Sequence, residues 1–513
     1  MTSIERLVSW VVPLAQTLDP LDVAGTDGFV WRSAAGTLLG TGVAARVPVG
    51  TGPARIERAA EAVTTLLEAI QLEDPDDSGL TPAAVGALPF HPATPGELVV
   101  PSLLLRTDEA GHSWAIVTGP EPSGRPRPAD LLARLRARAS DDGPWPAARR
   151  IDDGGSSHGE PSEGAPSDEG PSDGGPSGEG PSDGGLWTTR PALRRDGLPS
   201  RSGAPPAGKG WGSGTPTAGS GGGGSGGGGP GGGPEGGGSG TGNGGSGSSP
   251  SGLETWRAGV VAALAAIGVG RLDKVVLARE AMVEADWPFP RAELLRRLQR
   301  RPGGATFLYA DGGFVGASPE LLVRRQGRVA TSRPMAGTVP QGDGAAEAGG
   351  LARLTGSPKE AVEHRLVVDA VAEGLAKVAD RVEVGKPEVV RLATVAHLAT
   401  EITADLTGPL PTALELAGLL HPTPAVGGSP RDGALAAIAA LEPFDRGCYA
   451  GPVGWVDRSG DGEWAVALRG ATLKGRRAHL VAGAGIVPGS DPDAEWAETE
   501  HKLRAMLEVL LTP

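Results

Sequence analysis

Two pairs of glutamates are the residues whose types and spacing most clearly suggest chemistry. Within each pair the two carboxylates stand three residues apart, and each pair closely follows a Ser-Pro or Asp-Pro dipeptide; the pairs are Glu360 with Glu363 and Glu495 with Glu498. Ser and Asp favour the N-cap of a helix and Pro favours its first turn. Both pairs are therefore predicted on the first turns of helices, where residues three apart share one face.

Two interpretations of these acidic helix starts remain open. Carboxylates complement the helix macrodipole at an N-terminus, each contributing about 0.3–1 kcal/mol. Alternatively, the two helix starts face each other across one site, where four carboxylates would repel strongly unless a divalent cation lay between them. One or two carboxylates with substrate oxygens is the usual arrangement around magnesium. The sharper hypothesis is therefore a Mg²⁺ site.

Composition divides the chain into three regions. The 513 residues include 84 Gly, most of them between about 152 and 250, where Ser, Pro and acidic residues supply much of the rest. Such a segment cannot bury enough apolar surface to offset the entropy of ordering. We expect a disordered, Gly/Pro/Ser-rich insert at 149–251 between folded regions at 1–148 and 252–513.

Charge and cysteine content exclude several classes of protein. The formal net charge of −14 disfavours a nucleic-acid partner, because proteins that bind nucleic acids carry basic faces. A single cysteine, Cys448, excludes a disulfide framework and suits a reducing compartment. The first residues do not resemble a signal peptide, and no stretch approaches the roughly 20 apolar residues of a membrane span. We expect a soluble, cytoplasmic protein without a membrane partner.

Hydrophobic periodicity predicts strands interspersed with helices on both sides of the insert. Hairpin-like strand pairs are predicted at 27–47 and 96–119, and further strands at 274–285, 305–334, 448–457, 463–475 and 477–489. Helices are predicted at 54–70, 256–270, 292–301 and 357–379, and from about 491 onward. This order predicts an α+β fold with largely antiparallel sheets covered by helices.

Several motifs in the second folded region resemble those of the chorismate-utilising enzymes, and in particular the isochorismate synthases. They include "LDKVVLARE", "FVGASPELLVRR", "VEHRLVVDAV", "LLHPTPAVGGSPRDGAL" and "VAGAGIVPGSDPDAEWAETEHKL". The resemblance covers nearly all of 252–513 and continues more weakly into 1–148. It implies one fold of two packed, largely antiparallel sheets with helices outside, which the insert interrupts.

The resemblance also implies a reaction and the residues that perform it. Isochorismate forms when water adds at C2 of chorismate and hydroxide leaves from C4, which requires a base, an acid and a cation that polarises the conjugated carboxylate. Lys274 matches the family's base and Glu320 its general acid, although alone each would more simply be a surface residue. Four positions match the magnesium site: Glu363 and Glu498 as ligands, and Glu360 and Glu495 as supporting acids that act through water.

Residues that bind the two carboxylates of chorismate follow from the same resemblance. Arg469 matches a carboxylate-binding arginine, for which a bidentate geometry is available. The sequence "AGAGIVPG" is interpreted as a turn whose backbone N–H groups cradle a carboxylate oxygen, and the donors are those of Gly483, Ala484 and Gly485. The family's pocket further includes His397, which can instead be a buried structural histidine, and the backbone at Gly337 and Thr338.

Two positions bear on which family member this chain resembles. Ammonia-using anthranilate and aminodeoxychorismate synthases generally carry Gln where this chain has Lys274, so Lys274 favours water as the nucleophile. Salicylate synthases typically carry Thr where this chain has Ala425, so Ala425 favours release of isochorismate. Salicylate synthase remains the enzymatic alternative, and a non-catalytic scaffold organised by the insert is the other. The family's usual form predicts a monomer, and the product can feed menaquinone, siderophore or salicylate synthesis.

Overall fold

The computed structural model describes residues 6–15, 18–25, 28–120, 125–137, 145–151, 252–301, 306–340, 345–392 and 394–512. The predicted disordered insert lies outside the described residues, except for its first three positions. Residues 149–151 form the end of a strand, Ala148–Ile151, in the largest sheet. The first folded region therefore extends slightly further than its composition indicates.

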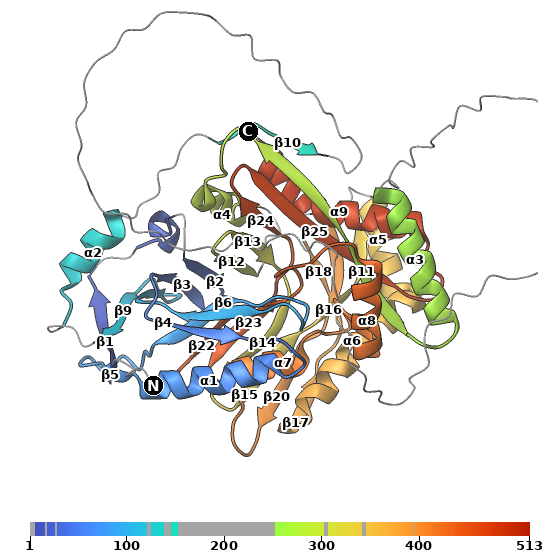
Figure 1. The fold of residues 1–513 in the computed structure, drawn as a ribbon. Coiled ribbons are helices and arrows are strands. Elements are labelled where there is room, and N and C mark those ends of the chain that lie inside the picture. Colours follow the sequence, from blue (N-terminus) through green and yellow to red (C-terminus); the bar gives the residue numbers. More distant parts are fainter. Residues whose placement is uncertain are drawn as a thin grey trace, which may run out of the picture. The chain divides into compact units, whose positions relative to one another are not determined.

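The largest sheet combines strands from both folded regions (Figure 1). It has 13 strands among the described residues, and apart from the strand at Ala148–Ile151 the strands from the first region follow those from the second. In spatial order these are β10 (Ala148–Ile151), β11 (Lys274–Ala285), β25 (Arg477–Ile486), β24 (Gly470–Lys474), β13 (Phe314–Ser318), β12 (Phe307–Asp311), β2 (Phe29–Ser33), β3 (Gly36–Thr41), β8 (Leu103–Thr107), β9 (Ser113–Pro120), β1 (Leu7–Leu14) and β5 (Gln71–Glu73), with β21 (Gly428–Ser429) paired to β11.

A second and a third sheet complete the β-structure of the described residues. The second has nine strands in the order β17 (Ala379–Val384), β20 (Ile402–Leu406), β15 (Val329–Arg333), β14 (Leu321–Gln326), β23 (Gly462–Val466), β22 (Pro452–Asp457), β6 (Ala83–Ala87), β7 (Gly96–Val100) and β4 (Ala45–Val49). The third has β16 (Met335–Pro340), β19 (Val395–Ala399) and β18 (Glu388–Arg391). The pairing of β1 with β5 is parallel, and the other pairings recorded among these strands are antiparallel.

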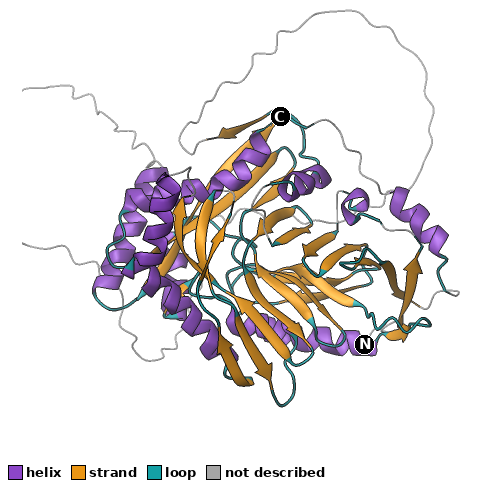
Figure 2. Ribbon diagram, turned by 180° about the vertical axis from the view of Figure 1, so that it is seen from behind, coloured by secondary structure: helices purple, strands orange, loops and turns teal. Residues whose placement is uncertain are grey.

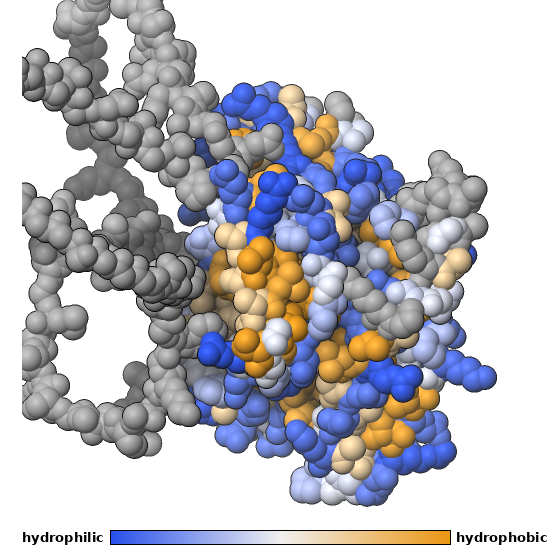
Figure 3. All heavy atoms as spheres, turned by 90° about the vertical axis from the view of Figure 1, so that its right-hand side faces the viewer, coloured by the Kyte–Doolittle hydropathy of each residue, from blue (hydrophilic) through white to orange (hydrophobic). Residues whose placement is uncertain are grey.

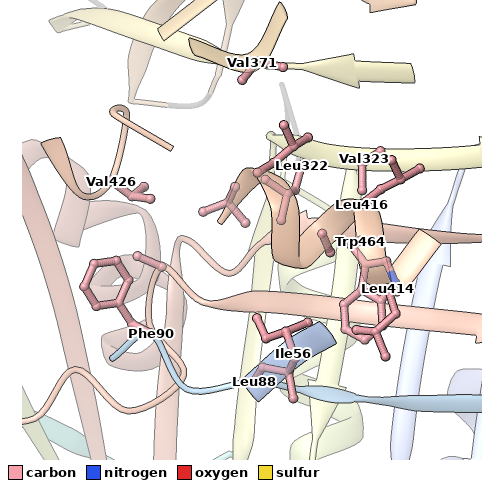
Figure 4. Packing of buried hydrophobic residues seen from close by; sticks show 14 of the residues in the cluster. Ile56, Leu88, Phe90, Leu322, Val323, Val371, Leu414, Leu416, Val426 and Trp464 are labelled. Carbon is pink, nitrogen blue, oxygen red and sulfur yellow. The ribbon is translucent and has the colours of Figure 1, made fainter. Parts of the chain in front are cut away.

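Helices pack outside the two large sheets (Figure 2). They are α1 (Arg55–Ala69), α2 (Pro128–Ala137), α3 (Gly252–Gly268), α4 (Arg291–Gln299), α5 (Ala345–Gly356), α6 (Pro358–Leu375), α7 (Ala413–Leu420), α8 (Arg431–Leu441) and α9 (Pro492–Leu511), with a short 3₁₀ helix at Pro20–Val23. One apolar cluster lies between the sheets and joins Trp31 and Tyr309 of the first sheet to Trp455 of the second. Another lies under the helices, where Ile56 of α1 and Leu414 of α7 pack near Trp464 (Figure 4). The predicted fold class is confirmed.

Both predicted helix starts are confirmed, with the expected caps. At α6 the Ser357 hydroxyl accepts a hydrogen bond from the Glu360 backbone N–H at 3.4 Å, and Pro358 opens the helix. At α9 the Asp491 carboxylate accepts from the N–H groups two and three residues later, at 3.1 and 2.9 Å. These caps fix the first turns on which the paired glutamates stand.

The segment predicted as one strand at 463–475 consists of two strands in different sheets. It divides into β23 of the second sheet and β24 of the first, with Arg469 between them at a φ of +51°. The chain also changes sheets at Pro319-Glu320, between β13 and β14. The two crossings are joined because the Val466 N–H donates to the Glu320 carbonyl at 3.1 Å. Glu320 and Arg469 therefore lie where the two sheets exchange chain.

The 96–119 segment also differs from its prediction as two strands. It holds three, β7, β8 and β9, because β7 and β8 are separated by Pro101-Ser102 and lie in different sheets. Proline lacks the N–H that continued ladder pairing would need.

The outer face of α3 is largely apolar. Val261 on this helix and Val269, which directly follows its last residue, are strongly exposed. Figure 3 shows the side of the molecule on which α3 lies, where apolar side chains gather among polar ones. No helix among the described residues is long and apolar enough to cross a bilayer.

One buried carboxylate joins the two folded regions, and replacing it should destabilise the protein. Glu463 of β23 accepts hydrogen bonds from Trp31 and Ser33 of β2, at 3.0 and 2.7 Å, and from Arg324 of β14. Because Glu463→Ala leaves all three donors without their acceptor, we expect a loss of about 3 kcal/mol in the free energy of unfolding. Denaturant titration measures this loss.

A solvent-exposed pair provides the control for this variant. Glu97 pairs with Arg46 where both side chains are about half exposed, so Glu97→Ala should change the free energy of unfolding by no more than about 0.5 kcal/mol. Equal losses in the two variants would contradict the assigned role of Glu463.

Candidate active site

A pocket lies where the three sheets meet. Side chains from both crossings line it together with residues of the third sheet, α6 and α9; they include Val276, Glu320, Met335, Gly337, Thr338, Glu363, His397, Ala425, Tyr449, Arg469, Gly483, Gly485 and Lys502. Its volume is about 50 Å³, whereas a cavity of about 150 Å³ holds benzene. A ring-shaped ligand therefore requires some wall side chains to move apart.

Lys274 and Glu363 form a buried ion pair at this pocket. Lys274 opens β11 and its side chain is only 1% exposed, and its Nζ donates to Glu363 Oε1 at 2.7 Å. Gly485 of β25 lies opposite Val276 of β11. A Cβ added to Gly485 would stand 2.8 Å from Glu363 Oε1 and 2.9 Å from Lys274 Cε. A larger residue at 485 would force the ends of the two paired side chains to shift.

The acidic start of α9 has two faces with different partners. Glu498 pairs with Lys502 at 2.6 Å, and Lys502 also donates to the Gly483 carbonyl at 2.9 Å on the pocket wall. Glu495 is buried on the same helix. Glu500, by contrast, binds Arg150 and Arg279. Burial acts to raise the pKa of Glu500, but the hydrogen bonds and charges of these arginines outweigh it and hold the pKa at about 2.

Glu360, the second acid of α6, lies beside the pocket backbone. A Cβ added to Gly337, whose φ is +75°, would meet a Glu360 carboxylate oxygen at 2.8 Å. Gly337 itself lines the pocket. The structure thus places Glu360 and Glu363 of α6 at the same pocket as Lys502, the partner of Glu498.

Glu320 is a buried carboxyl group with the properties of a proton donor. It is 3% exposed, and its Oε1 has no hydrogen-bond partner among the described residues. Burial raises the pKa of Glu320 to about 7, although the Met335 backbone N–H and the charges of Arg469, Lys274 and Lys502 oppose this shift. A carboxyl group of this kind carries a proton near neutral pH and can donate it to a bound molecule.

Arg469 and His397 form a hydrogen-bonded pair on the pocket wall. Burial, reinforced by the charges of Arg469 and Lys502, lowers the pKa of His397 to about 3, so the ring is neutral at pH 7. The Arg469 guanidinium can only donate, so His397 Nε2 accepts from it at 3.2 Å. The ring proton then lies on Nδ1, which donates to the Gly337 carbonyl at 3.0 Å and lies 3.2 Å from the Thr338 hydroxyl. His397 thereby orients Arg469.

Of the two predictions that cover "AGAGIVPG", the strand at 477–489 is confirmed as far as Ile486, and the turn at 483–485 is wrong. Gly483, Ala484 and Gly485 lie inside β25, paired with β11. The Val276 N–H points away from β25 and donates to the Gly427 carbonyl. Hydrogen-bonding direction alternates along an antiparallel ladder, so the next pair, Leu277 and Ala484, is a hydrogen-bonded one, and the Ala484 N–H points toward β11. Its N–H is therefore committed to the sheet and its side chain is buried. Gly483 and Gly485 reach the pocket because they lack side chains.

The sequence prediction omitted two polar residues of the pocket wall. Lys502 stands four residues after Glu498, and this spacing on one helix face could have revealed it. Tyr449 lies in the loop before β22 and lines the pocket. Its hydroxyl oxygen lies so close to Gly483 that a Cβ added to this glycine would be 3.3 Å from it. No local pattern marks Tyr449, because its approach to Gly483 is purely tertiary. Ala425 lines the pocket as expected.

Two carboxylates at or near the pocket have the chemistry of magnesium ligands. Among the described residues no three His, Cys, Asp or Glu side chains form a self-sufficient metal site. Magnesium in proteins is commonly held by only one or two carboxylates, with water and substrate oxygens filling the other positions. Glu363 lines the pocket and is paired with Lys274, and Glu498 is paired with Lys502 of the pocket wall.

Comparisons with known proteins show which proteins the chain resembles. Residues 247–511 match the model of a family described as chorismate binding enzyme. The isochorismate synthase DhbC of Bacillus subtilis is 43% identical over 270 residues, which are 50% of this chain and 68% of that protein. A putative 2,3-dihydroxybenzoate-specific isochorismate synthase from Bacillus anthracis aligns with a TM-score of 0.62 at 26% identity, covering 94% of this chain and 96% of the other.

A second solved structure extends the similarity of fold. MenF, the menaquinone-specific isochorismate synthase from Escherichia coli, aligns with a TM-score of 0.65 at 23% identity, over 99% of this chain and 95% of its own. At this identity the likeness concerns the fold alone.

The raised pKa of Glu320 predicts a pH-dependent effect of Glu320→Gln on stability. Below the ordinary carboxyl pKa of 4.5 the group is neutral in the folded and the unfolded chain. Between 4.5 and about 7 only the unfolded chain loses the proton, so this group's contribution to stability falls as pH rises, by about 3 kcal/mol in total. Above about 7 the loss is complete.

Glutamine cannot ionise, so the variant lacks this loss. The free energy of unfolding of Glu320→Gln, relative to the unmodified protein, should therefore increase by about 2–3 kcal/mol between pH 5 and pH 8. Denaturant titrations of both proteins at the two pH values measure it. A difference between the proteins that does not change with pH would mean that Glu320 is ionised in the folded state.

Proposed function

The chain belongs to the chorismate-binding enzyme family, and from this premise we propose that it is an isochorismate synthase. The enzyme adds water at C2 of chorismate while hydroxide leaves from C4. The observation that carries the proposal is a buried carboxyl group of raised pKa on the pocket wall, Glu320, together with the buried Lys274, which is ion-paired to Glu363 of the same wall. Water addition coupled to hydroxide loss needs an acid and a base of this kind.

The proposed roles balance protons and electrons. The Lys274 amine takes a proton from water as the water oxygen bonds to C2. The ring double bonds shift, the C4–O bond breaks, and the departing hydroxide takes the Glu320 proton and leaves as water. Transfer of one proton from Lys274 back to Glu320 through solvent restores both groups. The net reaction is an isomerisation.

Cationic side chains of the pocket supply the binding of the two substrate carboxylates. Arg469 has the fork geometry that matches a carboxylate, and His397 holds it in place. Lys502 adds a second cation on the same wall. A substrate carboxylate near Lys502 competes with Glu498 for its ammonium group, which is one way in which the small pocket opens on binding.

Glu363 and Glu498 are proposed to hold Mg²⁺, with Glu360 and Glu495 acting through water. When bound, the ion polarises the carboxylate that is conjugated to the ring. With the ion bound, Glu363 would serve it as a ligand, and Lys274, which pairs with Glu363 in this structure, would be left to face the attacking water.

The nature of the nucleophile and of the product follows from two positions. Lys274 suits a reaction that must deprotonate water, which ammonia would not require. Ala425 lines the pocket and favours release of isochorismate over elimination of pyruvate. The pathway that consumes the product depends on partner enzymes; menaquinone and siderophore synthesis both fit the names of the relatives.

Incubation with chorismate and Mg²⁺, followed by chromatography, should yield isochorismate. Lys274→Met keeps the length of the side chain without its amine, so kcat should fall by roughly 10²–10⁴-fold. Lys474→Met, at an exposed position on β24, is the matched control and should keep its rate. Salicylate with pyruvate, anthranilate when ammonium is present, or no turnover by the unmodified protein would each contradict the proposed function.

Removal of Mg²⁺ with EDTA should abolish turnover, and added Mg²⁺ should restore it. Glu498→Gln should raise the Mg²⁺ concentration for half-maximal activity by at least about tenfold, because a neutral amide is a poorer ligand. Glu500→Gln, on the same helix but bound to Arg150 and Arg279, should lower stability and leave the Mg²⁺ requirement unchanged. An equal shift in both variants would remove Glu498 from the proposed ligand set.

A further inference from the structure

One edge of β11 is completed by side chains along part of its length instead of by a strand. The opposite edge of β11 is fully paired with the neighbouring strand β25, from Val275 to Glu284. On the edge away from β25, β21 pairs with Lys274 and Val275, and β10 pairs from Met282 onward. Between β21 and β10 no strand among the described residues pairs with β11.

Arg446 and Glu442 occupy the first part of this gap. Arg446 Nη2 donates to the Val276 carbonyl at 2.7 Å, and Glu442 Oε1 accepts from the Ala278 N–H at 2.7 Å. In a strand, the carbonyl of one residue and the N–H two residues later point to the same edge. The two side chains also pair with each other, with Arg446 Nε donating to Glu442 Oε2 at 2.8 Å. They bind β11 as a neighbouring strand would.

The guanidinium also holds the loop that carries Ala425. Arg446 Nη1 donates to the Val426 carbonyl at 2.9 Å, and the Val276 N–H donates to the Gly427 carbonyl at 2.8 Å. Val276, Ala425 and Val426 all line the substrate pocket. One planar group thus sets the spacing between the strand that begins with Lys274 and the loop opposite it.

Arg446 is deeply buried and does not itself line the pocket. The side chains of Arg446 and Glu442 are 2% and 4% exposed, and the guanidinium lies 4.3 Å from the centre of the Phe90 ring. The backbone carbonyl of Arg446 accepts from the N–H of Tyr449, another wall residue. Burying an ion pair this deeply costs free energy, because both charges lose their hydration. The hydrogen bonds of Arg446 go to two walls of the pocket, at Val276 and Val426.

We propose that Arg446 is a positioning residue for the isochorismate synthase reaction, one that fixes Val276 and the Ala425–Val426 loop as facing walls of the substrate pocket. This inference rests on the proposed function. The fork shape of arginine is essential to the role, because it donates to both carbonyls and to Glu442 at once. Lysine keeps the charge but offers one nitrogen, so it cannot bridge the same three acceptors.

Arg446→Lys tests the proposal. Because the walls lose their common anchor, kcat/KM should fall on the order of tenfold, mainly through a higher KM for chorismate. A residue that only stabilised the fold would reduce the amount of active enzyme and leave the KM of the folded fraction unchanged. Arg324→Lys is the matched control, since Arg324 also pairs with a buried glutamate, Glu463, away from the pocket. It should lower the unfolding temperature with an unchanged KM.

A second variant keeps the test decisive if Arg446→Lys does not fold. The double variant Arg446→Gln, Glu442→Gln buries no unpaired charge, and should also raise KM. An unchanged KM in the folded Arg446 variants, or an equal rise in Arg324→Lys, would overturn the positioning role. Because the unmodified enzyme is assayed first, failure of the proposed function appears separately, as absence of isochorismate from that protein.

Discussion

The hydrogen-bonded contact between two chain crossings is the constraint on which the site depends. At Pro319-Glu320 and at Leu468-Arg469 the chain leaves one sheet and enters another. The Ser318 hydroxyl donates to the Val466 carbonyl at 2.5 Å, and the Val466 N–H returns a bond to the Glu320 carbonyl. Because both crossings are fixed to each other, Glu320 and Arg469 are held on one wall of the pocket. A residue with φ of +51° such as Arg469 is sustained only by such surroundings.

The pocket balances its charges by pairing cations with carboxylates from different elements. Lys274 of β11 meets Glu363 of α6, and Lys502 meets Glu498 within α9. Glu320 lacks such an ion pair, and its pKa of about 7 lets it carry a proton for part of the time at neutral pH. A substrate with two carboxylates, together with a divalent cation, can exchange partners with these pairs without burying net charge. The small volume of the pocket in this structure is consistent with such an exchange.

Helix α9 is anchored on the side away from the pocket. The Arg279 guanidinium stacks on the Trp496 ring at 3.8 Å and binds the Thr499 hydroxyl at 2.6 Å. The indole of Trp256 donates to the Pro492 carbonyl at 2.9 Å, and Arg150 of the first folded region binds Glu500. These contacts determine which face of the helix turns Glu495 and Glu498 inward. The first region thus supports a site to which it contributes no predicted catalytic residue.

Local residue order was sufficient to place the helix starts, the paired strands β2 and β3 within 27–47 and the class of fold, because caps, turns and periodicity act over a few residues. It did not place β4, which begins inside the predicted hairpin and joins the second sheet. It also brought the paired glutamates to light, and recognition of family motifs added Lys274 and Glu320. It failed at "AGAGIVPG", whose glycines suggest a turn but serve close packing against Glu363 and Tyr449 inside a strand. Which sheet each half of 463–475 joins, and which face of α9 turns toward the pocket, depends on partners far away in the sequence, such as Arg150 and Arg279 for Glu500. Such contacts leave no periodic trace in the chain, so only the folded structure decided them.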